Sequence, residues 1–272
     1  MLLTPFALFF LQIILGLTFL RISLRDVALT FKKWRLISLA LLIQFGLVAV
    51  VGWLIAGSLP PEILLGFLIA CSVPGGMSVP FLTNVLEGKV ELALTITFLA
   101  TVLSPLITPA MIYVLAGESL TVSPIEITKL LGYLIFIPLV IVEILKILLS
   151  EERLIRFSGK VGPPISSILF FLIVWGIISP NVEGVYQSPK LSLMIGFFSL
   201  IAMGSGYLSG YLSTKDRKDS IAVLLACGYK NNTFALVLAS SFFTPMAVYP
   251  TVIYNIVNNL AVAPIQALTR KK

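Results

Sequence analysis

The sequence has no histidine, only two cysteines and few charged residues, since Asp, Glu, Lys and Arg together make up 11% of its 272 residues. The lack of histidine excludes imidazole-based triads, histidine metal sites and histidine pH switches. Cys71 and Cys227 both lie inside apolar runs, so we expect no disulfide framework. The sequence also contains no nucleotide-binding loop, no metal-ligand cluster and no nucleophile paired with a base. These absences argue against an enzyme and against a resident metal or cofactor.

Hydrophobic residues are what the sequence has in excess, at 58% of the chain. A soluble domain of this length would not sustain such a fraction, so the composition predicts an all-α integral membrane protein, multi-pass and in a cell membrane. The first apolar run has no basic segment before it and Arg21 directly after it. This pattern favours a first spanning helix over a cleaved signal peptide.

Prolines, glycines and charged residues divide the chain into nine candidate membrane-spanning helices. A span needs about 20 mainly apolar residues, and each candidate meets that length with some tilt or irregularity. Their approximate ranges are 3–21, 35–56, 60–86, 89–116, 124–148, 161–179, 190–213, 219–243 and 245–269.

Basic residues are distributed unequally among the loops between these segments. The net charge is +7, and all of the 19 Lys and Arg residues except Lys129, Lys190 and Lys230 fall on one side of the predicted topology. Cytoplasmic loops are enriched in Lys and Arg, so we expect the N-terminus outside and the C-terminus inside, as an odd number of spans requires. Membrane topology therefore explains the positive charge, and we expect no nucleic-acid partner.

Two of the nine segments contain residues that break a helix. The third contains "SVPGGMSVP" (72–80) and the eighth contains "CGYKNN" (227–232). Non-helical backbone at membrane depth is tolerated only where it is buried in protein or lines a wet cavity. The two segments lie five helices apart and so run in opposite directions, which is typical of transporters built from inverted repeats. We predict that they cross at mid-membrane in one transmembrane domain, with residues 1–118 as a four-helix repeat and 119–272 as a five-helix repeat.

The first break combines a proline with two glycines. Pro74 lacks a backbone donor, and Gly75 and Gly76 permit non-helical angles, so a second half-helix could begin near Met77 with free N–H groups facing the gap. The N-terminus of a helix attracts anions. A simple loop between two short segments is the alternative, although residues 60–71 are too few to span a membrane alone.

The second break carries a lysine, Lys230. Insertion scales place a lysine at a helix centre about 3 kcal/mol uphill, so its side chain should face protein or water. Lys230 could provide positive charge for an anionic substrate, or it could reach an interface or pair with carbonyl groups freed at the break. Asparagine side chains nearby could face a cavity or simply join helices by hydrogen bonds. The predicted substrate-binding residues are Gly75, Gly76, Met77, Ser78, Thr97, Lys230, Asn231, Asn232 and Asn258.

The order and spacing of these motifs resemble the bile acid:sodium symporter family over nearly the whole chain. The stretch "IACSVPGGMSVPFLTNVLEGKVELALTITFLATVLSPLITPAMIYVLAG" (69–117) is similar to the family's fourth and fifth helices, and "CGYKNNTFALVLAS" resembles its ninth-helix motif Glu-x-Gly-x-Gln-Asn. "LQIILGLTFLRISLRDVALTFKKWRLISLALLIQFGL" (11–47) is similar to the opening region. The resemblance implies ten helices, or nine when the first is absent, in a mobile core domain and a panel domain. The implied activity is secondary transport of organic anions by elevator-like alternating access.

The chain departs from the family at the positions that bind sodium. The sodium-binding Ser-Asn pair is Val79 and Pro80 here, and the serine expected on the next helix is Ala93. Only Thr97 of that group remains a plausible ligand, and we assign it an ion-coupling role together with Lys230. Sodium prefers several hard oxygen ligands, so the resemblance implies that both sodium sites are lost.

The ninth-helix motif has also exchanged a carboxylate for an ammonium group. Its glutamate is Ala226 and its glutamine is Lys230, while Gly228 and Asn231 match the motif. We therefore expect Lys230 to stand in for bound sodium as the fixed positive charge that attracts the substrate anion. Burial disfavours the charged form of a lysine, so proton coupling through Lys230 is a variant of the same hypothesis.

These features predict a sodium-independent carrier of a small organic anion of the bile-acid or carboxylate type. Three alternatives remain open: a sodium-coupled symporter with altered sites, an arsenite-type metalloid efflux carrier using Cys71 or Cys227, and a ligand sensor that does not transport. The expected partners are the small anion and the lipid bilayer. The sequence does not predict the substrate, the direction of transport or the oligomeric state.

Overall fold

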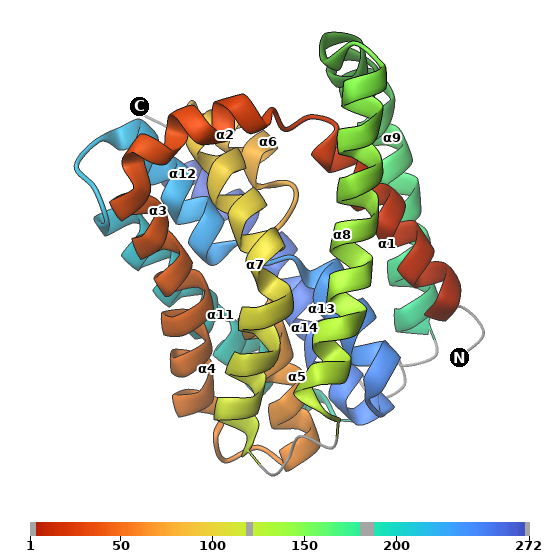
Figure 1. Cartoon of the computed structure of the whole chain (residues 1–272). Coiled ribbons are helices and arrows are strands. Elements are labelled where there is room, and N and C mark those ends of the chain that lie inside the picture. Colours follow the sequence, from red (N-terminus) through yellow and green to blue (C-terminus); the bar gives the residue numbers. More distant parts are fainter. Residues whose placement is uncertain (1–3, 118–121, 180–187, 270–272) are drawn as a thin grey trace.

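The computed structural model describes residues 4–117, 122–179 and 188–269, and these ranges are helical apart from turns and short connections (Figure 1). The predicted boundary between the two repeats, at residues 118 and 119, lies outside the described residues. So does the basic tail at 270–272, which contributed to the predicted topology.

The N-terminal part of the chain contains a short helix, an irregular long one, a helix broken in its middle and a second long helix. Leu24–Ala56 is helical almost throughout, but it passes through a 3₁₀ turn and a π-helix. The elements are α1 (Thr4–Phe19), α2 (Leu24–Thr30), η1 (Phe31–Lys33), α3 (Trp34–Leu41), the π-helix η2 (Leu42–Leu47), α4 (Val48–Ala56), α5 (Pro61–Ser72), α6 (Val79–Val85) and α7 (Val90–Ala116).

The C-terminal part contains three long helices followed by a second broken helix and two shorter ones. The elements are α8 (Pro124–Leu148), α9 (Glu151–Ile178), α11 (Pro189–Leu212), α12 (Arg217–Gly228), α13 (Asn232–Phe242), α14 (Pro245–Leu260) and α15 (Val262–Thr269). Both interruptions predicted from the sequence are present, one between α5 and α6 and the other between α12 and α13.

Two helices extend into regions that the sequence analysis assigned to loops. α9 begins at Glu151 rather than near residue 161, and α2 occupies part of the predicted basic loop at 21–35. Both corrections concern charged residues, which were used to mark the ends of apolar runs. A charged residue ends a membrane span but not a helix, because charged side chains are compatible with helical backbone outside the apolar layer.

Five helical segments of the described residues are long and apolar enough to cross a membrane: Leu24–Ala56, Val90–Ala116, Pro124–Leu148, Glu151–Ile177 and Pro189–Leu212. Phe6–Phe19, Pro61–Ser72 and Asn232–Phe242 are apolar but shorter. The all-helical character of the described residues is confirmed, whereas the nine-span topology stays a prediction.

The helices form two neighbouring groups. α1 packs against α8 and α9, and these three helices stand together on one side of the molecule (Figure 1). α4, α5, α11, α12 and α14 form the other group, in which α5 packs on α14 and α11 packs on α12. α7 contacts both α5 and α8, and α13 contacts α1, α9 and α14, so these two helices join the groups.

Polar contacts hold the connections at one end of the bundle. Lys146 Nζ donates hydrogen bonds to the backbone carbonyl of Ile22 at 2.6 Å and to Glu143 Oε1 at 2.9 Å. Lys33 forms an ion pair with Asp219 in the first turn of α12. Asp216 caps the same helix by accepting the Asp219 N–H at 2.9 Å, and this hydrogen bond lowers the pKa of the Asp216 carboxyl from its ordinary value.

Glycines on one face of α11 permit its close approach to α12. A Cβ atom added at Gly206 would lie 2.6 Å from the carbonyl oxygen of Cys227, and one at Gly210 would lie 2.8 Å from Leu224 Cα. A Cβ atom at Gly204 would meet nothing within 4 Å. Of these three glycines, two therefore face α12 and one does not.

The matched pair Gly206→Ala and Gly204→Ala tests this packing. We expect Gly206→Ala to destabilise the protein by about 1 to 3 kcal/mol, because the new methyl group has no space beside the backbone of α12. Gly204→Ala should leave stability unchanged or slightly higher, since alanine favours helix and the position is open. Thermal unfolding in detergent measures the difference. Equal effects of the two substitutions would contradict the assigned interface.

A crossing of two interrupted helices

The two breaks meet each other through their backbones. Gly75 and Lys230 form an isolated antiparallel β-bridge. The N–H of Gly76 donates to the carbonyl of Tyr229 at 2.8 Å, and the N–H of Asn231 donates to the carbonyl of Pro74 at 2.9 Å. The extended residues after α5 and after α12 therefore satisfy one another's hydrogen bonds, as non-helical backbone in an apolar interior requires.

Glycine is required in the segment after α5 because α12 and the residues that follow it approach so closely. A Cβ atom at Gly75 would lie 2.8 Å from the carbonyl oxygen of Ala226, and one at Gly76 would lie 2.6 Å from the ring of Tyr229. Both glycines were predicted as site residues, and the structure gives them a role in bringing the two backbones together.

The side chain of Lys230 points away from solvent into a group of carbonyl oxygens. Lys230 is 1% exposed, and its Nζ donates to the backbone carbonyls of Gln44 and, at 3.3 Å, of Val73. Val73 follows the last residue of α5, so the ammonium group lies at the negative end of that half-helix. The interpretation in which Lys230 pairs with carbonyls freed at the break describes this arrangement, whereas snorkelling to an interface does not.

Gln44, on the π-helix η2, holds both sides of the crossing. Its backbone carbonyl accepts from Lys230, and its side-chain Oε1 accepts the N–H of Gly75 at 3.0 Å. Gln44 is fully buried. Gln44 was not among the predicted site residues, although a glutamine within the apolar run "LALLIQFGLVAV" is a usable signal, because buried amides need partners.

Asparagine side chains form hydrogen bonds with the backbone at the second break, between α12 and α13. The amide of Asn258, on α14, accepts the N–H of Lys230 at 3.2 Å and donates to the carbonyl of Lys230 at 3.3 Å. Asn231 Oδ1 caps α13 by accepting the N–H of Phe234 at 3.2 Å. Asn258 therefore acts as a hydrogen-bonding contact between helices, which was one of its two proposed roles.

Several buried polar atoms on the elements that meet here have no hydrogen-bond partner among the described residues. They are Gln44 Nε2, Ser72 Oγ, Thr97 Oγ1, Asn231 Nδ2 and both side-chain polar atoms of Asn232. Unpaired polar groups are rare inside proteins and point to water, an ion or a ligand as their partner. The oxygen atoms named here belong to amides and hydroxyls, whereas the unpaired carboxylate oxygen Asp219 Oδ1 lies in the first turn of α12, away from the break.

Met77, Ser78 and Thr97 are the remaining predicted site residues, and of these Ser78 forms a hydrogen bond with the side chain of Tyr229. Met77 is half-buried, and its Sδ accepts from Thr18 Oγ1 at 3.5 Å, which links the break to α1. Ser78 is exposed, and Thr97 is buried on α7. The second half-helix, α6, begins at Val79 rather than at Met77. Tyr229 was not predicted, yet it connects the crossing to α14, since its hydroxyl donates to Asn259 Oδ1 at 3.1 Å.

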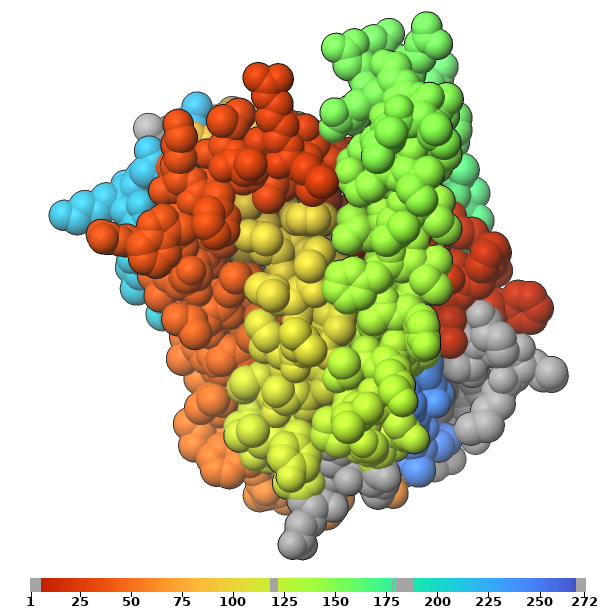
Figure 2. Space-filling view, viewed as in Figure 1, coloured from red at the N-terminus to blue at the C-terminus, as the bar shows by residue number. Residues whose placement is uncertain are grey.

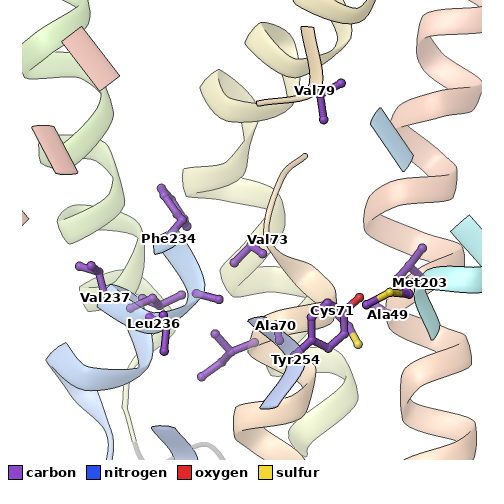
Figure 3. Close-up of a cluster of buried hydrophobic side chains, with 14 of the residues drawn as sticks. Ala49, Ala70, Cys71, Val73, Val79, Met203, Phe234, Leu236, Val237 and Tyr254 are labelled. Carbon is purple, nitrogen blue, oxygen red and sulfur yellow. The ribbon is translucent and has the colours of Figure 1, made fainter. Parts of the chain in front are cut away.

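Both cysteines are fully buried. Cys227 Sγ donates to the carbonyl of Ala40 at 3.5 Å. Cys71 lies beside Tyr254 among apolar side chains, below the extended segment that begins at Val73 (Figure 3). A buried thiol in apolar surroundings behaves as a small hydrophobic side chain, so this geometry adds no support to a cysteine-based metalloid carrier.

Comparison with known proteins agrees with this architecture. Residues 5–188 match the Sodium Bile acid symporter family. The "Uncharacterized sodium-dependent transporter YocS" of Bacillus subtilis is 27% identical over 247 residues, which cover 89% of this chain and 75% of that protein. The "Probable sodium/metabolite cotransporter BASS1, chloroplastic" of Arabidopsis thaliana is 23% identical over 219 residues, 79% of this chain and 53% of its own length.

A human relative, "P3 protein", is 29% identical over 208 residues, which cover 74% of this chain and 43% of that protein. The chain thus spans three quarters of the bacterial relative and about half of the plant and human ones.

The family match covers more than half of the residues, and the apolar helices fit a multi-pass membrane protein. The chain belongs to the sodium bile acid symporter family, whose members are transporters rather than enzymes.

Proposed function

We propose that this protein carries a small organic anion across a cell membrane without sodium, and that the ammonium group of Lys230 occupies the position of a coupling cation. The observation that carries the proposal is the buried contact of Lys230 Nζ with the carbonyls of Gln44 and Val73. Unwound carbonyls and the C-terminal ends of half-helices are the groups that coordinate sodium in transporters with broken helices. An ammonium group tethered there supplies a similar positive charge.

The ammonium group acts on the substrate through its charge rather than by direct contact. Lys230 is 1% exposed and its polar hydrogens face carbonyl oxygens, so in this conformation an anion would reach other groups first. Ser78 is exposed and Tyr229 is half-buried at the edge of the crossing. We propose that the anion binds at this edge of the crossing, near Ser78, Tyr229 and the exposed Asn259. There it would be attracted by the positive charge of Lys230 and by the N-terminus of α13.

The transport cycle that we propose follows the family's inverted-repeat plan. Nine spans, with the N-terminus outside and the C-terminus inside, would form two repeats whose broken helices cross near mid-membrane. The group of α1, α8 and α9 would serve as the panel domain, and the group containing the crossing would move as the core in an elevator-like cycle. The separate packing of the two groups supports this division.

Uptake into proteoliposomes separates the possible coupling modes. With radiolabelled carboxylates, sulfonates and sterol acids as candidate substrates, we expect an inward sodium gradient to change the initial rate by less than about twofold, because the cation position is already filled. A proton gradient imposed separately tests whether Lys230 exchanges a proton during the cycle. Strong acceleration by sodium alone would contradict the proposal, and the chain would then be a sodium-coupled symporter with altered sites.

Removing the charge of Lys230 should affect both stability and transport. Lys230→Gln leaves the carbonyls of Gln44 and Val73 without a charged donor, at a cost on the order of 2 kcal/mol, and it should abolish or strongly slow uptake. Lys190→Gln removes a lysine from an exposed position and provides the matched control. Thermal unfolding and uptake measure the two effects. Wild-type uptake by the Lys230→Gln variant would show that the ammonium group has only a structural role.

Restoring a carboxylate should move the site toward sodium dependence. In the double variant Ala226→Glu with Lys230→Gln, the fixed cation is removed and an acidic oxygen ligand is introduced near the end of α12. We expect this variant to regain uptake only when sodium is present, while Lys230→Gln alone stays inactive at every sodium concentration. Initial rates at graded sodium concentrations make the comparison. A double variant that is folded and transports equally well in potassium would contradict the assigned cation position.

A further inference from the structure

The segment formed by residues 21–35 lies across one end of the helix bundle. α2 runs crosswise to the long helices α4, α7 and α8 (Figure 1), and its side chains cover that end of the molecule (Figure 2). No residue of α2 or of η1 is buried. Ile22 is buried, Val27 packs against the hydrophobic core, and the ion pair of Lys33 with Asp219 fastens the segment to α12. Most of the other side chains of the segment are exposed.

Exposed basic and apolar side chains alternate along this segment. Its exposed basic residues are Arg21, Arg25, Lys32 and Arg35, and Asp26 is its one acidic residue. Phe31 and Trp34 are each 53% exposed, and Leu24 is 46% exposed. The guanidinium of Arg35 lies 5.5 Å from the centre of the Trp34 ring. Aromatic rings with polar edges are typical of the boundary between lipid and water, and Arg and Lys beside them reach the headgroups.

We propose that residues 21–35 bind the headgroups of anionic phospholipids in the leaflet that surrounds this end of the bundle. Unequal loop charge alone would explain the number of basic residues, but it does not require a crosswise helix with exposed leucine, phenylalanine and tryptophan. A short helix with exposed apolar side chains, flanked by exposed Arg, Lys and aromatic residues, is an arrangement that suits an anionic lipid surface. Bound lipid would hold α2 in place where it joins α1 to the remainder of the chain.

Fluorescence of Trp34 tests the proposal in vesicles. The chain has three tryptophans, and Trp53 and Trp175 are exposed, so Trp53→Phe with Trp175→Phe leaves Trp34 as the one reporter. The protein is reconstituted in phosphatidylcholine that contains equal mole fractions of brominated phosphatidylglycerol or brominated phosphatidylcholine. We expect the brominated anionic lipid to quench Trp34 several-fold more effectively, and we expect potassium chloride to reduce that preference.

Two double variants, each of which removes two positive charges, test whether the lipid preference depends on residues 21–35 or on other basic residues nearby. Arg25→Gln with Lys32→Gln should remove the preference for the anionic lipid. Lys215→Gln with Lys218→Gln, which alters one exposed lysine in the connection between α11 and α12 and another in the first turn of α12, should leave the preference intact. Equal quenching by the two lipids in the parent protein would overturn the proposal. The proposal would also be overturned if the preference for the anionic lipid survived in Arg25→Gln with Lys32→Gln, or if both double variants abolished it. A preference that potassium chloride does not reduce would overturn it as well.

Discussion

The two backbone hydrogen bonds between segments 74–76 and 229–231 satisfy polar groups that the interrupted helices would otherwise leave unpaired. Two half-helices that stop within an apolar bundle need partners for their backbone N–H and C=O groups, because no water is present in the hydrocarbon layer. The crossing provides those partners, and it imposes close approach at Gly75 and Gly76. The tight contact between α11 and α12 and the buried amides of Gln44 and Asn258 keep the two segments in register.

The position of Lys230 follows from the same need to satisfy backbone carbonyl groups at the breaks. A carbonyl at the end of α5 and another on the π-helix η2 converge on one point, and a positively charged group there offsets the partial negative charge of both. A mobile ion would meet that need only when bound, whereas the side chain of Lys230 is tethered to the crossing. Under our proposal, one residue thereby stabilises the crossing and takes the place of a coupling ion.

The sequence was sufficient to predict the helical membrane class and the two breaks, because prolines, glycines and a charge rarely occur together within an apolar run unless the helix is interrupted there. It also suggested that Lys230 could pair with freed carbonyls. Gln44 was missed, since its contacts with Gly75 and Lys230 join residues far apart in the chain and follow no short motif. The start of α9 at Glu151 was missed because charge marks the limit of the apolar layer and not the end of a helix. Asn258 was recognised as a candidate, but only three-dimensional contacts distinguish a side chain that holds the backbone from one that binds substrate.

The most direct test of the central claim is the sodium dependence of the thermal stability of the purified wild-type protein, measured against potassium and choline at equal ionic strength. A ligand that binds the folded state raises its unfolding temperature as its concentration rises. If the ammonium group of Lys230 occupies the cation position, the unfolding temperature should be the same in sodium, potassium and choline. A rise that is specific to sodium and saturates with concentration would contradict the account.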